Sequence, residues 1–175
     1  MSSEGKEVIT EAAEGSSSQP KPRKTVVTLV SSDEQKFEVD MALANQSEMI
    51  KNLILDMEDD VDEFVVPVLN VTGLVLAKVI QYWKQHAEAN DRDRLDALDK
   101  AFVDMHKELL FQVLIAVNFL ESRQLLNLLS KTIADNIKDM SVEEVRAYFS
   151  IESDFTEEEE RQVRAENQWA FEQQD

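Results

Sequence analysis

The residues of this chain that could do chemistry are an acidic run at residues 56–63 and two histidines, His86 and His106. The run holds six carboxylates, the ligand type that calcium prefers, but an EF-hand loop starting there needs glycine at its sixth position and glutamate at its twelfth. The sequence has Val61 and Pro67 at those positions, so we interpret the run as a solvated acidic loop. The histidines show no repeated ligand spacing, which favours surface or core roles over a metal site.

No other combination of residues supports catalysis. The absence of cysteine excludes thiolate catalysis, disulfides and zinc bound by cysteine, and glycines at positions 5, 15 and 73 alone cannot form a phosphate-binding loop. A Ser/His/Asp order cannot be assembled with any specificity either. We therefore predict no catalytic residues, no metal and no cofactor, and an enzyme is the last of the hypotheses.

The charge of the chain limits its partners. The 175 residues include 18 basic and 36 acidic side chains, a net charge of −18. Nucleic acids and anionic membranes are bound through lysine and arginine, so we predict neither as a partner. The lack of cysteine suits a reducing compartment, and the N-terminus shows no apolar segment of a secretory signal peptide.

The elements that must position any site are organised around residues 107–139. Residues 109–120 contain only two polar side chains, so we expect this helix to be covered nearly all round. It is shorter than the roughly 20 residues that a bilayer requires. After a break at residues 121–122, a second helix has two rows of apolar or small residues, which indicate burial on two sides. The rows are Leu126, Leu129, Ile133 and Ile137, and Leu125, Leu128 and Thr132.

The first half of the chain alternates strand and helix patterns. Residues 1–23 have few large apolar side chains and are predicted to be a disordered tail. Pro67 cannot donate a hydrogen bond to a neighbouring strand, so it places the third strand at an edge or ends it. The predicted elements are strands 25–30 and 36–39, a helix 41–57, a strand 64–68, a helix 72–86, a surface loop 87–97 and a short helix 98–105.

Two capping boxes, at residues 141–144 and 156–159, predict the starts of two further helices. The last helix, from residue 156 onward, has few apolar residues but ends with Trp169 and Phe171. An exposed tryptophan is a typical interface anchor. The residues alone leave open whether Trp169 anchors a partner or covers the core of its own chain.

At this point the chain resembles the Skp-type (S-phase-kinase-associated) adaptors of SCF ubiquitin ligases, most closely their plant members. The most specific matches are DFTEEEE at residues 154–160 and ENQWAFE at residues 166–172. The pair LF at residues 110–111, followed by AVNFL at 116–120, adds support. The resemblance covers about 150 residues, all except the N-terminal tail.

This resemblance implies an α+β fold with two parts. A BTB/POZ-like domain, a small sheet with helices, would span residues 24–137, with acidic loops at 56–63 and 87–97. A helical C-terminal extension that binds the F-box would span residues 138–175. The implied function is that of an adaptor in the nucleus and cytoplasm, which links a cullin to F-box substrate receptors for ubiquitination and proteasomal degradation.

The resemblance also assigns two binding surfaces. Asn118 and Phe119 match the positions that bind the N-terminal region of a cullin. F-box proteins would bind over about residues 114–173. The positions matched there are Leu126, Ser130, Ile133, Phe149, Ile151, Phe155 and Trp169.

Several residues depart from the family pattern and indicate a diverged paralogue. Phe119 stands in place of a tyrosine, Ser130 in place of a cysteine, and Glu34 and Gln124 in place of glycines. Two alternatives stay open: a BTB-like protein that dimerises and serves transcription or scaffolding, and an F-box-binding protein that no longer engages a cullin. The loss of the hydroxyl at Phe119 motivates the second alternative.

Overall fold

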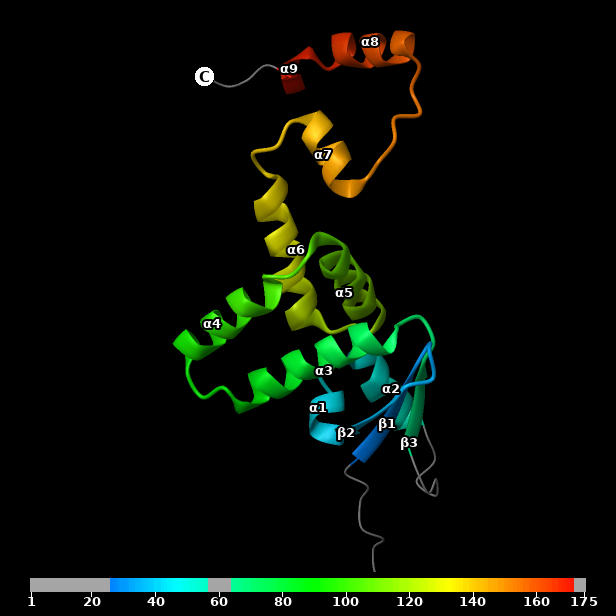
Figure 1. Cartoon of the computed structure of the whole chain (residues 1–175), viewed down its shortest axis with the longest axis vertical. Coiled ribbons are helices and arrows are strands. Elements are labelled where there is room, and N and C mark those ends of the chain that lie inside the picture. Colours follow the sequence, from blue (N-terminus) through cyan, green and yellow to red (C-terminus); the bar gives the residue numbers. More distant parts are fainter. Residues whose placement is uncertain (1–25, 57–63, 172–175) are drawn as a thin grey trace, which may run out of the picture.

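The computed structural model describes residues 26–56 and 64–171. It has the predicted α+β architecture, in which a small sheet is packed with helices and further helices follow at the C-terminal end (Figure 1). The predicted disordered tail and almost all of the acidic run at 56–63 lie outside the described residues.

The sheet has three strands in the order β2-β1-β3. β1 (Val26–Ser31) pairs antiparallel with β2 (Lys36–Asp40) and parallel with β3 (Phe64–Val68). Alternate residues such as Val27 and Leu29 are buried on the face of the sheet that packs against the core, because successive side chains of a strand point to opposite faces. The prediction that Pro67 places its strand at an edge is confirmed.

The turn between β1 and β2 is tied to the next helix. The Asp33 carboxylate accepts hydrogen bonds from the Ser31 hydroxyl (2.6 Å) and from the Gly73 N–H (2.7 Å), and both hold the pKa of Asp33 below its usual range. Gly73 begins α3 (Gly73–Glu88). Thr72 has the predicted N-cap position, but its side chain makes no capping bond. The cap of α3 therefore comes from a residue forty positions earlier.

The helix predicted at 41–57 is two helices, α1 (Met41–Ala44) and α2 (Glu48–Asp56). Between them, the buried Ser47 hydroxyl accepts from the Ile50 N–H and donates to the Leu120 carbonyl of a distant corner. The break between α1 and α2 therefore places Ser47 where it can bond to Leu120, which helical periodicity alone does not show.

The loop predicted at 87–97 is wrong. α3 continues to Glu88, and α4 (Arg92–Val103) begins after three residues, where the Asp91 side chain accepts from the Arg94 N–H (2.8 Å). Most charged residues of α4 are exposed, Asp99 contacts His86 of α3, and Phe102 is buried against Tyr82. The many charged residues led to the prediction of a loop, whereas the segment is an amphipathic helix with a regular N-cap.

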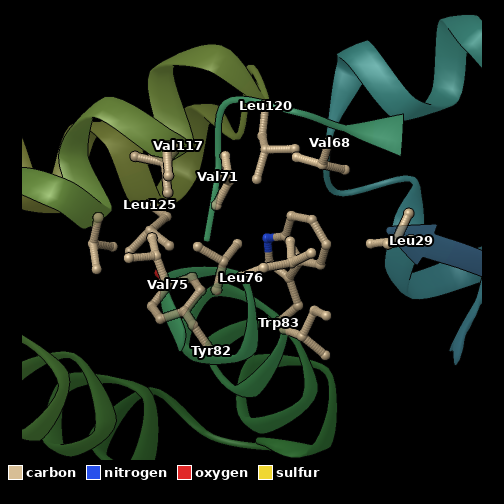
Figure 2. Packing of buried hydrophobic residues seen from close by; sticks show 14 of the residues in the cluster. Leu29, Val68, Val71, Val75, Leu76, Tyr82, Trp83, Val117, Leu120 and Leu125 are labelled. Carbon is tan, nitrogen blue, oxygen red and sulfur yellow. The ribbon is translucent and has the colours of Figure 1, made fainter. Parts of the chain in front are cut away.

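The core lies between the sheet, α3, α5 (Lys107–Phe119) and α6 (Arg123–Ile137). Figure 2 shows Leu76 and Trp83 of α3 in one buried cluster with Val117 of α5 and Leu125 of α6. The expectation that the first of these helices is covered nearly all round is wrong at Ile115, whose side chain is 67% exposed.

Three helices extend beyond the end of α6, away from the sheet (Figure 1). They are α7 (Val142–Phe149), α8 (Glu157–Glu166) and α9 (Gln168–Phe171). Both predicted capping boxes are confirmed, with reciprocal bonds at the starts of α7 and α8. The last helix is interrupted at Asn167, which separates α8 from α9. Within the described ranges, every helix is too short or too polar to cross a membrane.

Candidate protein interaction surfaces

The two residues assigned to cullin binding lie at the C-terminal end of α5. Asn118 is exposed, and Phe119 is half-buried against the core. α5 stops because Glu121 adopts a left-handed conformation with φ 52°, while the N–H groups of Glu121 and Ser122 donate to the carbonyls of Asn118 (3.2 Å) and Val117 (3.0 Å). This pattern of bonds is a Schellman motif, which fixes where a helix ends.

The same end of α5 is anchored to two other segments. Besides the bond from Ser47 to Leu120, the indole Nε1 of the buried Trp83 donates to the buried Ser122 hydroxyl (3.0 Å). Gln46 also donates to the carbonyl of Trp83 (3.2 Å). The α5–α6 corner, residues 118–122, is therefore held rigidly against α3 and the α1–α2 turn.

The α6 residues assigned to F-box binding differ in exposure. Ser130 is exposed and Leu126 is half-buried, so both are accessible. Ile133 is only 7% exposed and belongs to the core. In this conformation Ile133 packs in the core beneath the exposed face of α6, so contact with a partner would require a local rearrangement.

Phe149 is held in a cluster of aromatic rings that joins α7 to α5. Its ring stacks on Phe111 with centroids 5.5 Å apart, and Tyr148 meets both rings edge-on. The Lys107 ammonium lies 5.6 Å from the Tyr148 ring centroid, and Asn136 donates to the Tyr148 hydroxyl (3.2 Å). Sequence reasoning missed Phe111 and Tyr148, because their contact depends on how α7 folds back.

The remaining assigned residues lie on the extension and are uncovered. Ile151 is 57% exposed, Phe155 47% and Trp169 76%, and Phe149 keeps 37% of its surface exposed. Trp169 therefore does not cover the core of its own chain, which excludes one of the two roles that the residues alone left open for it. Large apolar side chains exposed along one short segment are typical of an interaction surface.

α8 is connected to α7 through charged side chains. Arg146 pairs with Glu160 (3.0 Å), and Arg164 pairs with Glu143 and, at 3.8 Å, with Glu160. The pKa of Glu143 is lowered, first by a backbone hydrogen bond and then by Arg164. Such surface pairs are weak singly and are screened by salt. α8 itself has no buried residues.

Both histidines have structural roles. The His86 side chain, 5% exposed, contacts Asp99 of α4 (2.7 Å) and Gln124 of α6 (3.2 Å), so it joins three helices. His106 is the N-cap residue of α5 and pairs with Glu108. Across residues 26–56 and 64–171 no three acidic or histidine side chains are grouped in a way that could hold a metal ion.

Comparison with known proteins gives these surfaces a context. Residues 25–88 match the tetramerisation (POZ) domain of the Skp1 family, and residues 123–170 match the family's dimerisation domain. The chain belongs to the Skp1 family. SKP1-like protein 11 of Arabidopsis thaliana is 44% identical over 151 residues, which cover 84% of this chain and 97% of that protein. SKP1-like protein 1A of the same plant is 42% identical over 158 residues, covering 83% and 97%.

Membership in the Skp1 family confirms the predicted BTB/POZ-like fold and the plant-type resemblance, and it supports an SCF adaptor role in general. The second match contains all seven positions assigned to F-box binding. Asn118 and Phe119 lie between the two matched ranges.

Proposed function

We propose that this protein is the adaptor subunit of an SCF ubiquitin ligase, which links a cullin to F-box receptors so that their substrates are ubiquitinated and degraded by the proteasome. The observation that carries the proposal is the uncovered apolar surface of α7–α9, in a segment that matches the Skp1 family. The adaptor would act in the nucleus and cytoplasm. It would bind its partners and would not be an enzyme.

The proposed mechanism is rigid spacing. The candidate cullin residues lie at the α5–α6 corner, near the N-terminal end of α6, and the F-box residues continue past its C-terminal end (Figure 1). A helix of 15 residues is roughly 22 Å long, so α6 separates the cullin residues from the F-box residues of α7–α9 by about that distance, while Leu126 and Ser130 lie between them on α6 itself. A fixed spacing would set how far a receptor-held substrate lies from the ubiquitin-loading end of the ligase.

The substitution Asn118→Lys tests the cullin surface. An unpaired ammonium buried at the centre of an interface costs on the order of 3–5 kcal/mol, so cullin binding should be lost while F-box binding is retained. The matched control is Asn90→Lys, at another exposed position, on the α3–α4 turn. Both affinities are measured by titration calorimetry with purified partners. Unchanged cullin affinity in Asn118→Lys would contradict the assignment of this surface.

A second function is favoured by one substitution. Phe119 lacks the hydroxyl that the family has at this position, so the protein could bind F-box proteins without a cullin and act as their chaperone or decoy. A pulldown of tagged protein from plant extract, scored for cullins and F-box proteins together, separates the two functions. Recovery of both partners supports the adaptor. Recovery of F-box proteins alone supports the second function, and self-association without either partner supports a dimerising BTB scaffold.

A further inference from the structure

Ile115 is the one residue at which the most apolar helix of the chain exposes a large aliphatic side chain. The neighbouring Val113, Ala116 and Val117 of α5 are buried, whereas Ile115 is 67% exposed. Single exposed aliphatic residues are common on protein surfaces and need no explanation by themselves. The position of Ile115 on α5 is what distinguishes it.

Residues three and four positions apart are neighbours on a helix surface. Ile115 therefore lies beside Asn118 and Phe119, one turn earlier on the same face of α5. Gln112, one turn before Ile115, is exposed as well, so this face forms a continuous surface. Ile115 is the large aliphatic side chain within that surface.

We propose that Ile115 is the apolar anchor of the cullin-binding surface and enters an apolar pocket of the cullin N-terminal region. This inference rests on the proposed function. The argument for this occupant is continuity, because Ile115 shares its helix face with both residues assigned to cullin binding. Specific interfaces bury about 800 Å² on each partner, which two residues at a helix end cannot supply.

The surroundings of Ile115 reduce the entropic cost of binding. The end of α5 is fixed by the Schellman motif and by the bonds from Ser47 and Trp83 described above. Isoleucine is β-branched, so in a helix it strongly prefers a single χ1 rotamer. An apolar group that is already immobile loses little freedom on binding, as is typical of interface anchors.

The experiment measures the affinity of full-length variants for a purified cullin N-terminal region and for an F-box protein. Ile115→Ala should weaken cullin binding by about tenfold or more, and Ile115→Val, which removes one methylene, by about threefold or less. F-box affinity and melting temperature should stay at their wild-type values. The matched control is Leu74→Ala on α3, since Leu74 is 61% exposed and should change neither affinity.

Distinct results would overturn the inference. If Ile115→Ala binds cullin as tightly as wild type while Asn118→Lys does not bind, Ile115 is not an anchor and the proposed function stands. If wild-type protein binds no cullin, the inference and the cullin part of the proposed function fail together. If Ile115→Ala dissociates a wild-type dimer and leaves cullin affinity unchanged, a second copy is the occupant and the inference is wrong.

Discussion

Trp169 provides the most direct test of the extension. A tryptophan side chain can bury up to about 250 Å², and 76% of Trp169 is exposed, so a partner can remove about 190 Å² from water. At about 25 cal/mol per Å² this corresponds to about 4–5 kcal/mol. Part of that free energy is offset by the ordering of the interface, so we expect Trp169→Ala to cost about 2–4 kcal/mol of F-box binding. The affinity should fall at least about thirtyfold.

The same substitution should leave the fold of the free protein unchanged, because Trp169 is not part of the core. Titration calorimetry with an F-box protein gives the affinity, and thermal unfolding followed by circular dichroism gives the melting temperature. Trp83→Ala is the contrasting variant. Trp83 is fully buried, and truncating such a residue costs about 3–5 kcal/mol of stability, so its melting temperature should fall.

Hydrogen exchange tests how Trp169 contributes. α8 has no buried residues and is joined to α7 through exposed ion pairs, so residues 157–171 should exchange quickly in the free protein and become protected with an F-box protein bound. Strong protection in the free protein, or an unchanged F-box affinity in Trp169→Ala, would refute the reasoning.

Three further predictions concern local chemistry. Phe119→Tyr should tighten cullin binding by about tenfold if the restored hydroxyl is hydrogen-bonded in the complex; unchanged affinity in calorimetry would show that the substitution is neutral. Glu34→Gly should raise the melting temperature by about 2–4 °C, because Glu34 has φ 62°, a conformation that costs about 1 kcal/mol in residues with a Cβ; a lower melting temperature would contradict this. Hydrogen bonds from the N-cap backbone N–H groups hold the pKa values of Glu144 and Glu159 below the usual 4.5. Their charged forms therefore stabilise α7 and α8 above about pH 4.5, and the helical signal in circular dichroism should fall as acid protonates them. If replacing both with glutamine leaves this acid transition unchanged, these carboxylates are not its cause.

Elements that depend on local patterns could be predicted from the sequence. The strands, the break between α5 and α6 and both capping boxes follow from residue alternation, periodicity and side chains within three positions of a helix start. The seven F-box positions, by contrast, came from the resemblance to the family. The structure shows six of them exposed or half-buried and one, Ile133, in the core.

The features that the sequence could not show depend on long-range contacts. The amphipathic face of α4 is defined by Tyr82, and the cap of α3 by Asp33, both of which come from other elements. Ile115 was not distinguished from its buried neighbours, because Leu114 and Ala116 beside it in the chain are apolar as well. Only the packed helices decide that the face of Gln112, Ile115 and Asn118 stays uncovered. The sequence by itself determined the three strands, most of the helices and which family the chain resembles, since those signals are local; it missed the start of α4 and the breaks before α2 and α9. Tertiary structure alone decided which apolar side chains are covered and which stay exposed to a partner, because burial depends on residues far apart in the chain.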